Sequence, residues 1–322
     1  MPPFPGDLGP VMLSPPPQFL LPTIFQPPPL YGHSYYGDHL MFSPAPETEV
    51  RDVWAANLEE ETRNIRTMLP HYPIVSIDTE FPGTIHDGAT TTPRHLRTPE
   101  QNYAVVKQNA DELRLLQLGI TLSDPAGDRC SVTWQFNFAG FDPRHHPHSA
   151  ASIAMLTSHG IDFPSLRLHG VDPVDFAAAF RCSGLACRRL TWAAFSGGYD
   201  FAYLAKVLTG GKPLPEKLDG FLDLVGEIFG PAVLDVKHLA RFCGDGGGIR
   251  GGLERVAAAL GVRRAAGRAH NAGSDSLLTS DVLHAMVDRF FSNSDVLNHA
   301  GAIDGLVQYR DSANYANYCT NM

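Results

Sequence analysis

Apolar residues recur along the chain at two different spacings, and each spacing predicts one kind of element. Between residues 54 and 69 the large apolar residues are four or seven positions apart, which places them on one face of a helix. The acidic residues 59–61 lie mostly on the other face. We expect the folded domain to begin here, soon after Thr48. The apolar face consists of Trp54, Leu58, Ile65 and Leu69.

Three predicted strands follow this helix. Residues 74–77 are a short apolar run that ends close to the turn pair Pro82-Gly83, which is typical of a buried strand. Residues 113–122 are a second candidate, and residues 130–138 are a third, in which apolar and polar side chains alternate. The sequence Asp-Pro-Ala-Gly-Asp over residues 124–128 favours a turn between the last two. We therefore expect these two strands to form an antiparallel hairpin.

The second half of the chain alternates between strand and helix. Residues 190–195 and 232–236 are predicted strands, each followed by a helical pattern, the first of which starts at Tyr199 after a Gly-Gly break. Such units connect parallel strands. A hairpin joined to parallel units predicts an α/β fold with a mixed sheet flanked by helices in a single domain. The last long helix is expected from about Ser274 to Phe291.

The N-terminal segment has a different composition from the rest. Half of the 26 prolines precede residue 48, and proline both fixes φ and lacks an amide donor. We interpret residues 1–48 as a disordered, partly polyproline-II tail. Its Leu-x-Pro repeats, which start at Leu8, Leu13 and Leu20, are either a docking motif for a groove on a partner or part of a biased linker.

The expected domain covers residues 49–300. Residues 84–103 are rich in Gly, Thr and Pro and are predicted to form a long loop near the end of the first strand. Residues 301–322 show no strong periodicity and are interpreted as a C-terminal tail.

Composition restricts the compartment and the class of protein. No apolar run reaches the roughly 18 residues that span a bilayer, so we expect no membrane segment. The first fifty residues contain neither Lys nor Arg, unlike a secretory signal or an organelle transit peptide, which favours a location in the cytoplasm and nucleus.

Five cysteines without a Cys-x-x-Cys spacing argue against a disulfide framework and a structural zinc site. The net charge of -9 is unusual for a protein that binds nucleic acid, unless bound cations reverse the local field.

Asp78 and Glu80 stand at the end of the first apolar strand. Residues i and i+2 of a strand point to the same face, so these two carboxylates project together. An Asp-x-Glu triplet alone is too common to define a site.

Two further acids lie on faces of helices that should be apolar. Asp275 lies on the stripe that Leu278 and Val282 continue, and Asp200 begins the stripe of Leu204 and Leu208. Each could be a helix N-terminal acid that the helix dipole stabilises. However, a buried carboxylate needs a partner or a cation, and we find no obvious Arg partner at these positions.

Converging carboxylates form a hard-oxygen site that suits Mg²⁺ or Mn²⁺. Two such ions would stabilise the attacking and the leaving oxygen of a phosphodiester displacement. His270 precedes Asp275 by five residues and lies just before the predicted helix, where a neutral imidazole can act as a general base.

Three ordered blocks of sequence carry a resemblance to a known family. They are Asp-Thr-Glu-Phe-Pro-Gly from Asp78, Phe-Ser-Gly-Gly-Tyr-Asp-Phe from Phe195, and His-Asn-Ala-Gly-Ser-Asp-Ser from His270. These blocks resemble the exonuclease motifs of the His-containing branch of the DEDD superfamily. More narrowly, residues 50–292 resemble the Caf/Pop-type deadenylase subunit of the Ccr-Not complex. Supporting stretches include Leu-Gln-Leu-Gly from Leu116, Thr-Trp-Gln-Phe-Asn-Phe from Thr133 and Asp-Val-Lys from Asp235.

The resemblance implies a ribonuclease H-like fold and the removal of 3′-terminal adenylates from mRNA with release of AMP. It implies two divalent metal ions held by Asp78, Glu80, Asp200 and Asp275, and it assigns the general base to His270. The implied partners are poly(A) RNA, the Not scaffold subunit and a second deadenylase of the complex.

The chain departs from the family pattern just before Asp200. Family members often have Phe-His-Ser-Gly-Tyr-Asp where this chain has Ser196 and Gly197 in place of the His and Ser. The four acids and His270 are retained, so the departure concerns the rate or the contacts to the terminal nucleotide.

Two other motifs are not interpreted as functional sites. The motif Gly246-x-Gly248-x-x-Gly251 follows a predicted helix, whereas a dinucleotide fingerprint follows a strand. The His-rich residues 145–148 are better interpreted as a solvated loop than as a metal site.

Two other functions are alternatives to a ribonuclease. A non-catalytic adaptor with the same fold would be expected to lose metal ligands. A DNA-directed proofreading exonuclease would lack the Trp-Gln-Phe-Asn-Phe block.

Overall fold

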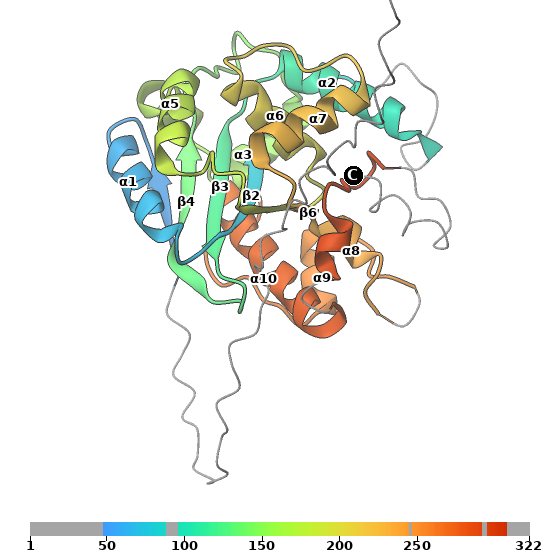
Figure 1. The fold of residues 1–322 in the computed structure, drawn as a ribbon. Coiled ribbons are helices and arrows are strands. Elements are labelled where there is room, and N and C mark those ends of the chain that lie inside the picture. Colours follow the sequence, from blue (N-terminus) through green and yellow to red (C-terminus); the bar gives the residue numbers. More distant parts are fainter. Residues whose placement is uncertain (1–47, 88–95, 245–246, 292–294, 308–322) are drawn as a thin grey trace, which may run out of the picture.

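The computed structural model describes residues 48–87, 96–244, 247–291 and 295–307. The predicted N-terminal tail and its Leu-x-Pro repeats lie outside these residues. Six strands form one sheet in the order β1-β4-β3-β2-β5-β6, and helices cover both of its faces (Figure 1). This arrangement confirms the predicted α/β class and the ribonuclease H-like mixed sheet.

The sheet combines an antiparallel centre with parallel flanks. β2 (Ile74–Glu80) pairs with β3 (Gln117–Ser123), and β3 pairs with β4 (Arg129–Asn137), in both cases antiparallel. The predicted hairpin is therefore confirmed. β5 (Thr191–Ala194) is parallel to β2, and β6 (Val233–Asp235) is parallel to β5, as the strand and helix units predicted.

One face of the sheet carries the larger group of helices. Their apolar residues form a continuous core with Val75 and Ile77 of β2. α6 and α7 lie in front of the strands in Figure 1, while α1 packs against α5 at the edge. These helices are α1 (Leu58–Met68), α2 (Pro99–Glu112), α5 (Pro173–Ser183), α6 (Gly198–Leu208) and α7 (Leu218–Phe229).

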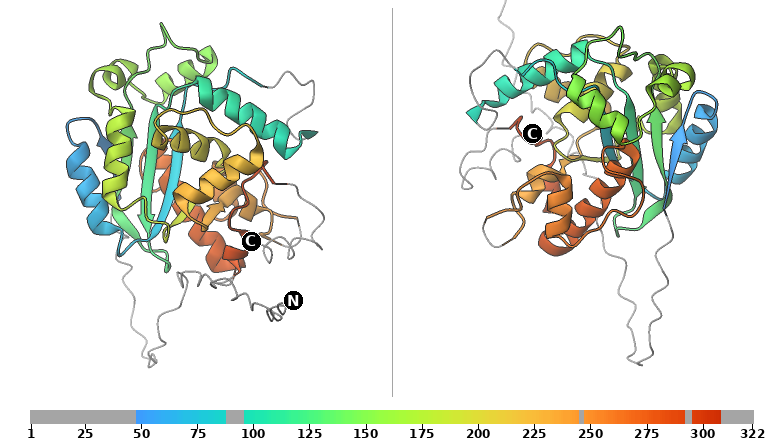
Figure 2. Two further views of the ribbon diagram at one scale, coloured as in Figure 1. Left: turned by 45° about the horizontal axis from the view of Figure 1, so that its top comes forward. Right: turned by 180° about the vertical axis from the view of Figure 1, so that it is seen from behind.

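The opposite face is covered mainly by α10 (Ala272–Phe290). This long helix runs across β2, β3 and β4, as the rear view in Figure 2 shows. Ile74 of β2 packs here, so alternate side chains of one strand serve the two faces. α8 (Val236–Ala240) and α9 (Leu253–Ala259) complete this layer. A third, smaller apolar cluster involves α3 (Ala150–Ser158) and α4 (Phe163–His169), and a 3₁₀ turn, η2, covers Val296–His299.

The strand β1 and the helix α2 are among the elements that were not predicted from sequence. β1 (Glu49–Val53) is an edge strand parallel to β4, and its side chains are mostly exposed or half-buried, so apolar alternation is absent. The predicted loop over residues 84–103 is wrong at its end, because α2 begins at Pro99. Thr98 and Gln101 form a reciprocal capping box there, a signal that the loop interpretation overlooked.

Some boundaries also differ from the prediction. β3 begins at Gln117, four residues after the expected start, and Val236 begins α8 and does not belong to β6. The chain also continues to pack beyond residue 300. Ile303 and Leu306 are buried in the main core, so the expected tail does not describe residues 302–306.

Candidate active site

β2 carries Asp78 and Glu80 on the face of the sheet that α10 covers. Glu80 is the last residue of the strand and is buried, whereas Asp78 is half-buried. Asp78 pairs in register with Gly119 of β3. The two carboxylates therefore share one face of the strand, as the strand periodicity predicted, and this face is the one that α10 covers.

Gly119 allows α10 to lie directly against the sheet. A Cβ atom at this position would lie 1.9 Å from the carbonyl oxygen of Ala272, the first residue of α10. The amide of Gly273 also donates a 3.1 Å hydrogen bond to the side chain of Gln135 on β4. This close packing of α10 on β3 places the first turn of α10, which contains Asp275, next to the strand position that carries Asp78.

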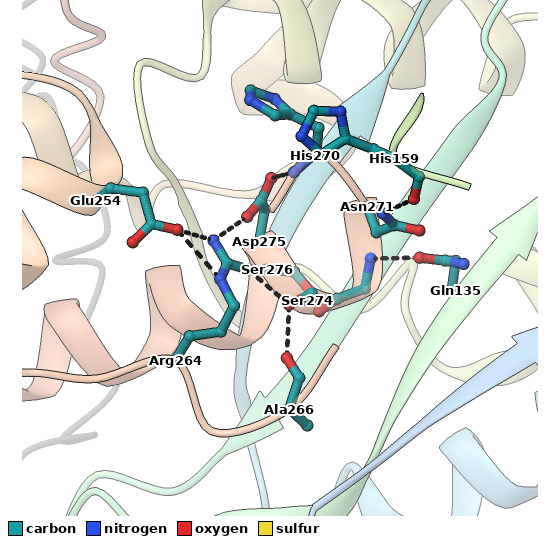
Figure 3. A network of polar contacts seen from close by, with 11 residues as sticks. Gln135, His159, Glu254, Arg264, Ala266, His270, Asn271, Ser274, Asp275 and Ser276 are labelled. Carbon is teal, nitrogen blue, oxygen red and sulfur yellow. Dashed lines mark hydrogen bonds and ion pairs between the residues drawn. The ribbon is translucent and has the colours of Figure 1, made fainter. Parts of the chain in front are cut away.

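Asp275 is buried and has two partners (Figure 3). The backbone amide of His270 donates to one carboxylate oxygen at 2.9 Å, and the Arg264 guanidinium donates to the other at 2.5 Å. Arg264 also pairs with Glu254 and donates to the hydroxyl of Ser274. The expectation that Asp275 lacks an Arg partner is therefore wrong, because Arg264 precedes the helix in a segment without detectable periodicity.

Asp200 reaches the site from the opposite face of the sheet. It is the third residue of α6, it is 6% exposed, and its Oδ1 accepts a 2.7 Å hydrogen bond from the hydroxyl of Thr79. α6 begins immediately after a turn at Ser196, a non-glycine residue with a φ of 60°. Such a conformation is uncommon outside glycine and fixes the direction in which the helix leaves β5.

The acids interact strongly with one another. Burial raises the pKa of Asp78 well above its usual value, and repulsion from Asp200, Asp275 and Glu80 raises it further. Burial and the charges of Asp275 and Asp200 raise the pKa of Glu80 to about 8. Burial also raises the pKa of Asp200 to about 7, although the hydrogen bond from Thr79 opposes this shift. For Asp275 the upward shift of the pKa from burial is opposed by Arg264.

Glu80, His270 and Asp275 each offer a ligand atom, and the three atoms lie within 4.8 Å of one another. His270 is exposed and has a φ of 59°, and its ring lies at the mouth of the carboxylate cluster. Repelling carboxylates with raised pKa values are stabilised when a cation neutralises them, and carboxylate oxygens are the ligands that suit Mg²⁺ or Mn²⁺. Asp78 lies close enough to Asp200, Asp275 and Glu80 for their charges to raise its pKa, although neither Asp78 nor Asp200 belongs to the trio with the closest ligand atoms. The structure thus brings the five residues predicted from sequence into one region.

His159 is a neighbour that the sequence did not reveal. It follows α3, and its ring centroid lies 4.7 Å from that of His270 in an edge-to-face arrangement (Figure 3). The Asn271 side chain donates to the carbonyl oxygen of His159 at 3.0 Å, and the ring Nδ1 of His159 contacts the carbonyl of Met155 at 2.8 Å. These contacts hold the end of α3 against the His270 segment. A single histidine at a helix end has no sequence signal for this role.

The other motifs considered from sequence lie elsewhere. In the His-rich segment, His146 Nδ1 accepts from the amide of Asp142 at 2.9 Å, and His148 Nδ1 contacts the carbonyl of His146 at 2.9 Å. These contacts are local and fit a structural loop. Gly246 is outside the described residues. Among the helices that the structure describes, none combines the length and the apolar character that crossing a membrane requires.

A ribonuclease H-like sheet with four carboxylates and a histidine at the end of a central strand is the arrangement of the DEDD exonuclease class. Residues 53–175 match the model of the CAF1 family ribonucleases. The chain is 38% identical over 266 residues to "Probable CCR4-associated factor 1 homolog 7" of Arabidopsis thaliana, covering 80% of this chain and 93% of the relative. The chain therefore belongs to the CAF1 family of ribonucleases.

Solved structures agree with this assignment. "Poly(A) ribonuclease pop2" of Schizosaccharomyces pombe is 36% identical over 248 residues, which cover 76% of this chain and 71% of the relative. Its Mg²⁺- and Mn²⁺-bound structure superposes with a TM-score of 0.72 at 34% identity, covering 80% of this chain and 99% of that chain. A yeast CAF1 co-crystallised with the NOT1 MIF4G domain gives a TM-score of 0.63 at 28% identity, with 82% and 100% coverage.

Proposed function

We propose that this protein is a poly(A)-specific 3′-to-5′ exoribonuclease that shortens mRNA tails and releases AMP. The observation that carries the proposal is the convergence of Asp78, Glu80, Asp200 and Asp275, with His270 at their mouth. We propose that these four acids hold two divalent metal ions, Mg²⁺ or Mn²⁺. The metal-bound structure of the S. pombe relative supports this assignment.

When bound, the two ions would supply positive charge to the attacking and leaving oxygens of the phosphodiester. The protein contributes a rigid arrangement of ligands. Asp78 and Glu80 are fixed by β2, while Asp200 and Asp275 are fixed by the first turns of two helices from opposite faces. The fold already holds these carboxylates in place, so metal binding would require little rearrangement.

His270 is proposed to accept the proton of the attacking water. Its exposed position allows the imidazole to pass this proton on to solvent after each cycle. Its backbone amide holds Asp275, so one residue connects the proposed base to one of the proposed ligands.

We further propose that the protein acts within a Ccr-Not complex in mRNA decay and gene-expression control, in the cytoplasm and nucleus. The co-crystal of a yeast CAF1 with NOT1 supports a Not scaffold partner. A second deadenylase and the scaffold would supply the RNA recruitment that a chain of net charge -9 lacks.

The test uses a 5′-labelled RNA that ends in twenty adenylates and a matched RNA that ends in twenty uridylates. With Mn²⁺ or Mg²⁺, we expect stepwise shortening of the adenylate tail, release of AMP, and slower attack on the uridylate tail. Excess EDTA and the variant Asp78→Ala should each abolish shortening. The variant Asp124→Ala, in the distant hairpin turn, is the matched control and should retain activity.

Failure of the wild-type chain to shorten either RNA in the presence of metal would overturn the nuclease proposal. Co-purification of such an inactive chain with a Not scaffold would then favour the adaptor function. Equal degradation of a DNA oligonucleotide would favour the proofreading class. Fluorescent tagging in cells tests the location, and exclusion from either compartment would contradict that part of the proposal.

A further inference from the structure

Asp235 is a fully buried carboxylate outside the set of predicted site residues. It ends β6, and its relative exposure is 0%. Five backbone amides donate to its two oxygens at distances between 2.9 and 3.2 Å. They belong to Ser196, Gly197, Lys237, His238 and Asp304.

Two of these amides join Asp235 to the Ser196-Gly197 turn, which precedes the helix that carries Asp200. The amides of Ser196 and Gly197 donate at 3.2 and 2.9 Å. Ser196 has a φ of 60°, which is unfavourable for a non-glycine residue and requires support from its surroundings. α6 starts at Gly198, directly after the Ser196-Gly197 turn, so this turn determines where the first turn of α6, and therefore Asp200, lies.

A third amide joins the end of the described chain to the same point. The amide of Asp304 donates to Asp235 at 2.9 Å, and the amide of Gly301 donates to the carbonyl of Val233 at 2.8 Å. Leu306 then packs against the start of α6, since its Cδ1 lies 3.6 Å from where a Cβ of Gly198 would be. Leu306 therefore contacts the start of α6, while Asp235 holds the turn that precedes this helix.

A helix cap alone does not account for this arrangement. Capping of α8 uses only the amides of Lys237 and His238. The remaining three amides come from segments that are distant in sequence and that meet only at Asp235. A carboxylate that accepts hydrogen bonds from several backbone amides fixes the relative positions of the segments that supply those amides.

We propose that Asp235 is a positioning residue of the nuclease site, which holds the Ser196-Gly197 turn and residues 301–306 so that Asp200 reaches the other carboxylates. The proposal rests on the proposed function for its effect on catalysis. Its effect on the geometry of the carboxylates is independent of which nucleic acid is cleaved.

The central variant is Asp235→Asn in the full-length chain. The amide group of Asn keeps one acceptor, but its NH₂ would face backbone amides that need an acceptor. We expect the affinity for Mn²⁺, measured by calorimetry, and the kcat on the adenylate-tailed RNA to fall by about 10-fold or more, with KM unchanged, as is typical when a residue that orients a metal ligand is lost. Leu306→Ala should act in the same direction but more weakly.

Two controls separate positioning from general loss of stability. Ile65→Ala removes a fully buried side chain of α1, far from the site, and should lower the Tm while leaving Mn²⁺ affinity and kcat unchanged. Asp124→Asn makes the same chemical change in a carboxylate that holds the amides of Ala126 and Asp128 in the hairpin turn. It should also leave both quantities unchanged.

Equal Mn²⁺ affinity and kcat in Asp235→Asn and wild type would overturn the proposal. A wild-type chain that binds Mn²⁺ but cleaves no RNA would instead contradict the proposed function. In that case the comparison of Mn²⁺ affinity between Asp235→Asn and wild type would still test the role of Asp235. A crystal structure of Asp235→Asn shows the position of the Asp200 carboxylate independently of metal binding. An Asp200 carboxylate that still accepts the hydrogen bond from Thr79 in this variant would overturn the proposal.

Discussion

The hydroxyl of Thr79 donates a 2.7 Å hydrogen bond to Oδ1 of Asp200, a residue 121 positions later in the chain. Thr79 lies between Asp78 and Glu80 but points to the opposite face of β2, where α6 packs. A single strand therefore supplies two carboxylates on one face and the partner of a third carboxylate on the other.

Replacing Thr79 by Val removes this hydrogen bond while preserving the shape of the side chain. We expect the kcat of Thr79→Val on adenylate-tailed RNA to fall by about 10-fold, because Asp200 loses the group that orients it. Thr79→Ser keeps the hydroxyl and should remain close to wild type. Unchanged rates in Thr79→Val would show that Asp200 is oriented without this bond.

Asp78→Asn should abolish cleavage and, in excess EDTA, stabilise the protein. Asp78 is repelled by Asp200, Asp275 and Glu80, and the neutral amide removes that repulsion. About 1 kcal/mol of relief corresponds to an increase in Tm of roughly 2–4 °C for a domain of this size. Differential scanning calorimetry measures it, and a lower Tm than wild type under these conditions would contradict the repulsive cluster.

His270→Gln distinguishes a general base from a metal ligand. For a base we expect kcat to fall by about 100-fold or more while Mn²⁺ affinity is retained. Calorimetric titration with Mn²⁺ provides the comparison. A parallel loss of affinity would assign His270 to the ligands, a role that its proximity to Glu80 and Asp275 also permits.

Metal should stabilise the protein more strongly at pH 8 than at pH 6. Burial and mutual repulsion raise the pKa of Glu80 to about 8 and that of Asp200 to about 7. Groups with raised folded-state pKa values contribute stability at low pH that is lost as pH rises through those values, because the folded state must then carry the charges. The metal-free protein therefore loses this contribution between about pH 4 and pH 8, and Mn²⁺ restores stability by binding the ionised forms.

Thermal melting in EDTA and in Mn²⁺ at both pH values tests this linkage. An increase in Tm on adding Mn²⁺ that is the same at pH 6 and pH 8 would mean that these carboxylates do not titrate with the metal site.

Gly119→Ala should impair both folding and cleavage. The added Cβ would lie 1.9 Å from the carbonyl of Ala272, so α10 must move away from the sheet and carry Asp275 with it. Gly226→Ala is the matched control, because nothing lies within 4 Å of its Cβ and it lies inside α7. There the change should stabilise the protein by up to about 1 kcal/mol through helix propensity. Urea unfolding and the RNA assay together would show whether the two variants differ in this way.

Much of the fold follows from local patterns in the sequence. The period-two alternation of residues 130–138 predicted β4, and the turn residues after Asp124 predicted the hairpin, because these features depend only on neighbours in the chain. β1 escaped prediction because it is stabilised by pairing with β4 and not by an apolar pattern of its own. α2 was overlooked because its capping box lies at the end of a segment rich in loop-forming residues.

The sequence by itself determined which residues form the candidate site. Asp78 and Glu80 share a face because strand side chains alternate, and Asp200 and Asp275 interrupt apolar stripes that must face inward. Only the tertiary structure decided how these residues are supported. Arg264, His159 and Asp235 lie in segments whose local patterns carry no trace of their partners. The contact of Arg264 depends on the path of the segment before α10, that of His159 on where the end of α3 meets His270, and that of Asp235 on the pairing of β6 with β5.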